Sequence, residues 1–354
     1  MPAPELRWTA DGRLLVLGDA RGQSFLYEVA AAGGPVRALA GGGWQATALS
    51  LDRAAERAVL AATPPETPGE LYLVNKRHPP PRCLTAYNRA YFAAHPPARL
   101  EKLSFARHGG DIECRVWRPP DFDPARRYPL VLDIHGGPNA AFYDAFTLTQ
   151  QVLATAGYLV LAVNARGSTT YGRAFTMAAL GDWGGEDYHD LMAAVELMAA
   201  RPEIDADRLG VHGYSYGGFM AAWLIGHTRR FKAAVVGGAC LDLPSMYGTS
   251  DIGVSFGERQ WGGTRREAFA AMVERSPLTY APAVETPVLH GEADLRCPIA
   301  QAEQYFVALK RHGKTVQFVR FPDCSHLFVH VGHPTMREEY LRRTLEWFDR
   351  YLRR

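Results

Sequence analysis

The sequence is short of several features that mark specialised classes of protein. Cysteine is scarce, with 5 in 354 residues, and no two of them stand in a Cys-x-x-Cys spacing. An odd, scattered set argues against a disulfide-stabilised secreted domain and against a cysteine zinc site. The formal net charge is only +2, so no polyanionic partner such as nucleic acid is indicated.

Long apolar runs are also missing. No uninterrupted stretch approaches the roughly 20 residues that a membrane-spanning helix needs, so we expect no membrane partner. The opening residues, MPAPE, show no basic segment followed by an apolar run, which is the pattern of a secretory signal. We therefore expect a soluble, cytoplasmic protein. The composition, 47% hydrophobic, allows a large core, and 354 residues suggest two unequal domains.

Residues 1–98 are the first expected domain. Short alternating runs such as 24–29 and 70–74 predict strands, and turns rich in glycine and proline separate them. Two units follow each other at a spacing of about 40 residues, the length of a four-stranded propeller blade. Because a closed propeller typically needs 4–8 blades, we expect a partial β-propeller. A small irregular antiparallel sheet is the alternative.

Residues 99–354 are the second expected domain. In this part, apolar runs typical of strands alternate with helical patterns. The predicted strands are 130–135, 158–164, 209–213, 233–237, 287–290 and 316–321. The predicted helices are 188–200, 219–226, 300–312 and 335–352. Such alternation indicates an α/β fold with a mostly parallel, doubly wound sheet, whose functional residues lie at the carboxyl ends of the strands.

The loop after the predicted strand 209–213 contains a Gly-x-Ser-x-Gly motif centred on Ser215. At a strand-to-helix turn this motif is the nucleophile elbow of the α/β-hydrolase fold. The glycines are needed because the sharp turn leaves no space for side chains beside the serine. We predict Ser215 as the nucleophile and the backbone N–H of Tyr216 as one donor to the oxyanion that forms during the reaction.

A serine nucleophile needs a histidine base and an acid that orients it, and in this fold the chain order is serine, acid, histidine. The histidines after Ser215 are His227, His290, His312, His326, His330 and His333. His326 is chosen because it lies in the loop between the last strand and the last helix. His227 and His312 lie in or at the end of helices, and His290 precedes the acid.

Asp294 is the predicted acid, because it lies in the loop after the predicted strand 287–290. Glu292 comes too early in that turn, and Asp323 shares a short loop with His326. A second oxyanion donor is expected from an early loop at a strand end, and the His-Gly-Gly-Pro sequence of residues 135–138 fits this role.

A series of motifs in the second domain resembles the prolyl oligopeptidase family. They are His135–Pro138, Asn164–Ser168 with Tyr171-Gly172, Asp182–Asp187, the elbow extended to Met220, and His290–Pro298. Within the family, Tyr247–Gly253 and Glu346–Leu352 resemble the acylaminoacyl-peptidase branch most.

This resemblance implies a serine peptidase that acts on short peptides, with an N-terminal propeller that screens out folded proteins. The triad of the family falls on Ser215, Asp294 and His326, and its oxyanion donors fall on Gly137 and Tyr216. The family also implies a substrate-binding role for Arg296, for which a charge pair near the triad is the alternative. No metal or organic cofactor is implied, and acyl-blocked N-termini are favoured by the branch alone.

Two departures from the family pattern lead to expectations of their own. The propeller is represented by about two blades, so the chain looks either truncated or reduced. The strand before Asp294 is about two residues short, which would draw the acid back by roughly 6–7 Å unless the start of the strand absorbs the loss.

Other readings stay open at this point. A redox-sensitive link between Cys297 and Cys324 is a hypothesis, because these residues flank the acid and base loops. A carboxylesterase of the same fold, or a binding protein that has lost activity, are the functional alternatives. Unpaired blade edges also make a homo-oligomer an expectation.

Overall fold

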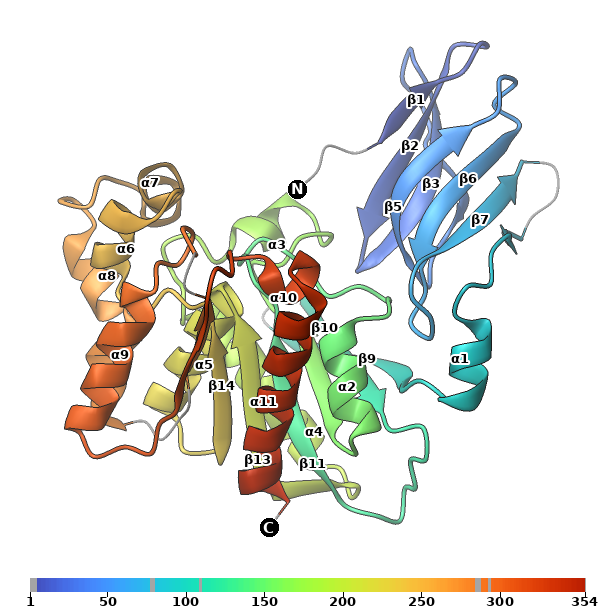
Figure 1. Ribbon diagram of the computed structural model, residues 1–354. Helices are drawn as coiled ribbons and strands as arrows, with labels where there is room; N and C mark the ends of the chain where they lie inside the picture. The colour runs from blue at the N-terminus through green and yellow to red at the C-terminus, as the bar shows by residue number, and fades with distance from the viewer. Residues whose placement is uncertain (1–4, 77–79, 108–109, 284–287, 292–293, 354) are drawn as a thin grey trace.

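The computed structural model describes residues 5–76, 80–107, 110–283, 288–291 and 294–353. Its N-terminal part consists of two four-stranded antiparallel sheets, each with its strands in sequence order (Figure 1). The first holds β1 (Leu6–Trp8), β2 (Arg13–Ala20), β3 (Gln23–Ala30) and β4 (Arg37–Gly41). The second holds β5 (Gln45–Leu51), β6 (Arg57–Thr63), β7 (Glu70–Asn75) and β8 (Arg82–Cys83).

The facing sides of the two small sheets share one hydrophobic core. Leu15, Leu26 and Leu60 are almost fully buried in it, and Trp44 from the connection between the sheets packs there too. In β3 and β6, buried and partly exposed residues alternate, as the period of two in a strand requires. The short α1 (Arg89–Ala94) then leads to the larger part of the chain.

The larger part is built on one eight-stranded sheet with the order β16-β15-β14-β13-β11-β12-β10-β9. Its strands are β9 (Arg99–Arg107), β10 (Gly110–Arg118), β11 (Tyr128–Ile134), β12 (Leu159–Asn164), β13 (Ile204–Tyr214), β14 (Ala233–Gly237), β15 (Val288–Gly291) and β16 (Phe318–Phe321). From β12 to β16 every neighbouring pair is parallel, whereas β9 and β10 add an antiparallel edge. All residues of β11, β12 and β14 are buried, because helices cover both faces of the sheet.

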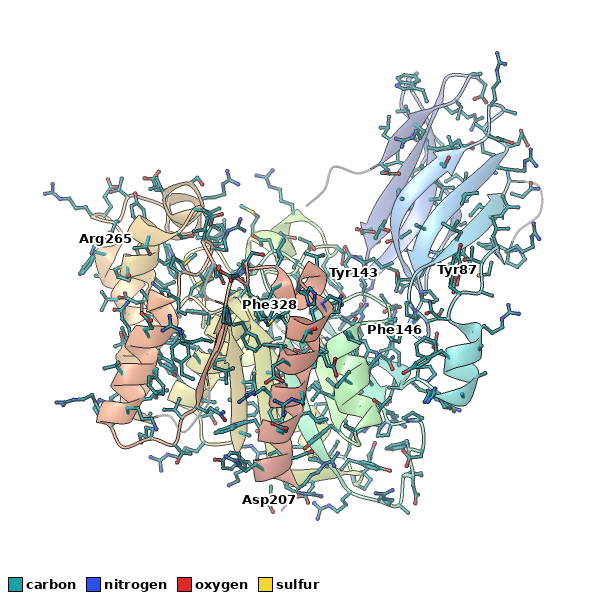
Figure 2. All side chains as sticks on the ribbon, in the orientation of Figure 1. Tyr87, Tyr143, Phe146, Asp207, Arg265 and Phe328 are labelled. Carbon is teal, nitrogen blue, oxygen red and sulfur yellow. The ribbon has the colours of Figure 1, made fainter. Side chains whose placement is uncertain are left out.

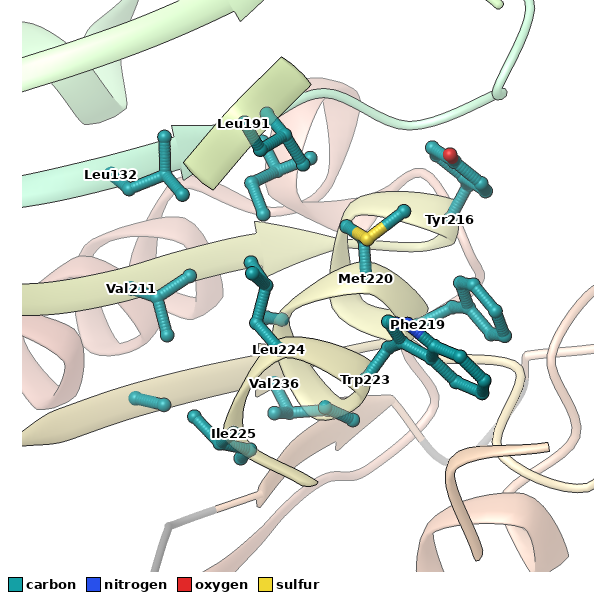
Figure 3. Close-up of a cluster of buried hydrophobic side chains, with 14 of the residues drawn as sticks. Leu132, Leu191, Val211, Tyr216, Phe219, Met220, Trp223, Leu224, Ile225 and Val236 are labelled. Carbon is teal, nitrogen blue, oxygen red and sulfur yellow. The ribbon is translucent and has the colours of Figure 1, made fainter. Parts of the chain in front are cut away.

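One face packs against α4 (Glu186–Ala199), α5 (Tyr216–His227) and α9 (Ala300–Arg311). The other face packs against α2 (Leu148–Thr155) and α11 (Pro334–Leu352), which lie in front of the sheet in Figure 1. Helix α5 is the most deeply buried. Figure 3 shows its Met220 and Leu224 packed towards Val211 of β13.

The remaining helices are short. They are α3 (Arg173–Met177), α6 (Leu243–Thr249), α7 (Gly253–Trp261), α8 (Phe269–Glu274), the 3-10 helix η1 (Pro277–Ala283) and α10 (Phe328–Val331). Across the described ranges, no helix combines the length and the apolar character needed to cross a bilayer.

The two parts of the chain are joined through the loop between β11 and α2. The N–H of Asp144 donates to Gly22 O at 2.8 Å, and the N–H of Phe146 donates to Pro64 O at 2.8 Å. Arg115, which is fully buried, donates to Asp144 Oδ1 at 2.9 Å and to Arg21 O at 3.0 Å. The N-terminal sheets are thereby fixed beside the carboxyl ends of the central strands.

Candidate active site

The turn between β13 and α5 holds Ser215 in a strained backbone conformation. Strand β13 ends at Tyr214 and α5 begins at Tyr216, and Ser215 between them has φ 63° and ψ −123°. A non-glycine residue rarely adopts a positive φ, so such a residue is held in place by its surroundings. Part of that support is the N–H of Ser215, which donates to Gly237 O at 2.9 Å.

The glycines of the motif are required by close backbone approach. A Cβ on Gly213 would lie 2.0 Å from Gly217 O, and a Cβ on Gly217 would lie 2.0 Å from Ile134 O. These distances leave no room for any side chain, which explains the motif in physical terms.

The structure brings the three predicted triad residues together. His326 Nε2 lies 3.0 Å from Ser215 Oγ, and His326 Nδ1 lies 2.7 Å from Asp294 Oδ2. The Asp294 side chain is fully buried. Its Oδ1 accepts the N–H groups of Arg296 at 2.9 Å and Cys297 at 2.8 Å. These backbone donors fix the carboxylate, so that Oδ2 faces the imidazole.

The short β15 does not separate the acid from the base. It has four residues and pairs in parallel with β14 and β16, and Asp294 still reaches His326. The expected withdrawal of the acid is therefore not seen. Of the alternative acids, Asp323 is exposed on its turn, and Glu292 lies outside the described residues.

The other histidines have different surroundings. His227 stacks on Trp223 at the end of α5, His312 follows α9, and His333 accepts from the N–H of Thr335 at the start of α11. The side chain of His290 lies outside the described residues, and His330 lines the cavity beside Ser215.

The two predicted oxyanion donors lie on the same cavity as Ser215. Gly136 approaches the serine so closely that an added Cβ would lie 3.4 Å from Ser215 Cβ. Gly137 has φ +123°, and an added Cβ there would lie 2.5 Å from Asn139 N. Only glycine fits this position, so the backbone of the loop can come up to the nucleophile.

Tyr216 is anchored by a buried acid whose role the sequence did not reveal. The Tyr216 hydroxyl donates to the carboxyl group of Asp187, and its ring packs edge-on against Trp183 at 5.0 Å. Burial raises the pKa of Asp187 to about 7. Asp187 and Trp183 belong to the motif at residues 182–187, which was recognised only as part of the family pattern.

Arg296 forms a two-point ion pair with Asp251. Its Nε and Nη2 lie 2.8 Å and 3.1 Å from the two carboxylate oxygens, and this pairing holds the pKa of Asp251 below its usual range. Arg296 also lines the Ser215 cavity. The structure therefore contains the charge pair that was the alternative for Arg296 and also places this residue where a substrate-binding arginine is needed. Asp251 was missed because 45 residues separate it from Arg296 in the sequence.

The cavity beside Ser215 has a volume of about 450 Å³ and a largely apolar inner wall. Trp183, Met246, Ile252 and Phe256 form much of this wall. The wall can enclose an apolar side chain next to the nucleophile.

Two thiols in the same wall correct the cysteine hypothesis. Cys297 Sγ lies 3.2 Å from Cys240 Sγ, and both residues are buried. The neighbour of Cys297 is thus Cys240, and the expected approach to Cys324 is wrong. All five cysteines are free thiols in the structure. Within the described part of the chain, no group of three or more His, Cys, Asp or Glu side chains is arranged to hold a metal ion.

Fold and geometry define an α/β hydrolase with a Ser-His-Asp arrangement. Residues 144–354 match the model of the prolyl oligopeptidase family, and the chain belongs to this family. It is 39% identical over 353 residues to the uncharacterized peptidase YuxL of Bacillus subtilis, a match that covers 98% of this chain and 53% of that protein.

Solved structures of acylaminoacyl peptidases resemble the whole described chain. The Pyrococcus horikoshii acylaminoacyl peptidase superposes with a TM-score of 0.91 at 27% identity, covering 99% of this chain and 55% of that chain. An acylaminoacyl peptidase in complex with Z-Gly-Gly-Phe-chloromethyl ketone gives a TM-score of 0.89 at 28% identity, covering 99% and 56%. The predicted fold class, with a partial propeller before an α/β-hydrolase domain, is confirmed, as is the acylaminoacyl-peptidase branch. The chain spans about half the length of these relatives.

Proposed function

We propose that this chain is a serine peptidase that hydrolyses short peptides and releases N-acylated amino acids. The observation that carries the proposal is the hydrogen-bonded series from Ser215 Oγ through His326 to the buried Asp294. A serine hydroxyl becomes a nucleophile when a positioned imidazole takes its proton, and the acid fixes the imidazole tautomer.

The reaction proceeds by acyl transfer. His326 Nε2 takes the proton of Ser215 as Oγ attacks the scissile carbonyl, and later gives it to the leaving nitrogen. The N–H groups of Gly137 and Tyr216 stabilise the oxyanion. Water then attacks the acyl-enzyme with His326 as the base, and the acid product leaves.

The walls of the Ser215 cavity give each part of the substrate a partner. The apolar wall takes the side chain of the residue whose carbonyl is attacked, and a relative has a structure with a peptide inhibitor ending in Phe. Arg296, steadied by Asp251, binds a carbonyl oxygen of the acyl part.

The test is labelling and turnover. The chain should be labelled by a fluorophosphonate probe and should hydrolyse an acetyl-amino-acid anilide, and Ser215→Ala should abolish both. Comparing the anilide with the matched p-nitrophenyl ester separates a peptidase from an esterase. Comparing an acetylated with a free dipeptide anilide shows which peptide end is recognised. Labelling that persists at another serine would refute the assignment, and an unlabelled, inactive wild type would favour a binding protein.

Three further proposals concern the chain as a whole. We propose a division into a partial propeller at residues 1–98 and a catalytic domain at residues 99–354, supported by pairing of the central sheet from Arg99 onward. Limited proteolysis should cut first near residue 98. We also propose a cytoplasmic location and a homo-oligomer formed through blade edges. Fractionation and light scattering test these two, and a monomer in solution would remove the second.

A further inference from the structure

A second cavity, of about 480 Å³, adjoins the one at Ser215. Asn139, Tyr214 and His330 line both cavities, so the two share a wall. The proposed reaction assigns no role to the second cavity. Its volume lies in the range of small-molecule pockets, roughly 300–1,000 Å³.

The two cavities extend to opposite faces of the central sheet. Trp183 and Met246 of the Ser215 cavity belong to the core on the α5 face. Phe142 and Tyr340 of the second cavity belong to the core on the face of α2 and α11. Ser215, at the carboxyl end of β13, therefore stands between two spaces that diverge from it.

The position of His326 decides which part of a substrate faces the second cavity. Its Nε2 must give a proton to the leaving nitrogen, so the leaving part lies on the His326 side of the scissile carbonyl. Helix α10 begins at Phe328, two residues after His326, and its Val329 and His330 line the second cavity. A group that departs past His326 meets this opening.

We infer that the second cavity binds the leaving part of the substrate, and that it favours a bulky uncharged amine such as an aromatic amide. This inference rests on the proposed peptidase function. The reaction is that given above: the C–N bond breaks, the amine takes the proton from His326, and the acyl group stays on Ser215.

The chemistry of the wall determines the preference for an uncharged group. Phe142, Ala141 and Ala145 give it an apolar surface. Among the described residues that line it there is no lysine or arginine, so a free carboxylate would have no cation partner. The carboxylate of Asp133 is already engaged, since its Oδ1 lies 2.6 Å from His212 Nδ1 and its Oδ2 accepts from Gln150 Nε2.

The N-terminal sheets limit the size of the second cavity. Gln45, the first residue of β5, lines it together with Tyr143. The Tyr143 hydroxyl donates to Asp19 Oδ2 at 2.9 Å, and Figure 2 labels Tyr143 where the catalytic part meets the N-terminal strands. A leaving group larger than one or two residues would therefore press against the N-terminal part.

The experiment compares two substrates that carry the same acetyl-amino-acid acyl group, a 2-naphthylamide and a methyl ester. Thr149→Trp places an indole in the second cavity from the first turn of α2. The ratio of kcat/KM for the naphthylamide to kcat/KM for the ester should fall roughly tenfold or more, because the bulky amine loses its space. Leu148→Trp, at the exposed neighbouring position outside the cavity lining, should keep the wild-type ratio.

Ala141→Trp, from the loop on the opposite side, is the second filling variant, used if Thr149→Trp does not fold. An unchanged ratio in a folded filling variant would overturn the inference, as would an equal fall of both substrates. Those outcomes differ from failure of the proposed function, in which wild-type protein hydrolyses neither substrate.

Discussion

His326 Nε2 lies 3.0 Å from Ser215 Oγ although 111 residues separate them in the sequence. The contact exists because β13, β15 and β16 are parallel, so the loops after their carboxyl ends meet at one edge of the sheet. Each loop contributes one residue of the triad. The hydrogen bond therefore depends on the register of the whole sheet.

Asp294→Asn should reduce kcat strongly while leaving the protein folded. The Asn oxygen would accept the N–H groups of Arg296 and Cys297, so its NH₂ would face His326 Nδ1 and favour the wrong imidazole tautomer. In serine proteases this change costs about 10⁴-fold in kcat. Steady-state kinetics on an acetyl-amino-acid anilide measures it, with urea unfolding as the control for folding. Activity within tenfold of wild type would remove Asp294 as the acid.

Gly217→Ala should destroy the elbow, since its Cβ would lie 2.0 Å from Ile134 O. We expect loss of fluorophosphonate labelling together with a large loss of stability in thermal unfolding. Gly248→Ala is the matched control, because no atom lies within 4 Å of its added Cβ and it sits in α6. This control should raise helix stability by up to about 1 kcal/mol and keep activity. Equal behaviour of the two variants would contradict the packing argument.

Arg296→Met should raise KM more than it lowers kcat, because a bound carbonyl loses a charged donor. We expect kcat/KM to fall roughly tenfold or more. Asp251→Asn should act in the same direction and more weakly, since it frees Arg296 from its two-point pair. Arg320→Met breaks a similarly exposed pair with Glu303 outside the cavity lining and serves as the control. If both arginine variants behave alike, Arg296 has no special part in substrate binding.

Asp187 should make the protein more stable in mild acid than in base. Its pKa is about 7 in the folded chain and 3.8 as the ordinary value, so the folded chain binds more protons between these pH values. The free energy of unfolding must then fall as pH rises through this window, by up to about 1.4 kcal/mol per pH unit. Above a pH of about 7 this contribution is gone.

Urea unfolding at about pH 5 and about pH 8 tests this for wild type and Asp187→Asn. Because Asn does not titrate, the wild type should gain more stability than the variant on going to the lower pH. The same stability difference at both pH values would show that Asp187 is ionised throughout.

Local patterns were enough to predict most of the elements around the site. Residues 300–312 and 335–352 were predicted as helices, and the structure has α9 at Ala300–Arg311 and α11 at Pro334–Leu352. Periodicity identifies such helices because one face packs on the sheet. Helices α6, α7 and α8 were not predicted, because they are short and their positions depend on contacts around the cavity.

The sequence by itself determined the elbow at Ser215 and the order in which the acid and the base follow it. Both depend on neighbouring residues: glycines beside the serine, and loops that come directly after apolar strands. Only the tertiary structure decided the partners of Arg296, Cys297 and Tyr216, which are Asp251, Cys240 and Asp187. Pairs of this kind join residues far apart in the chain, and they form only where packing of the helices brings the two side chains into contact.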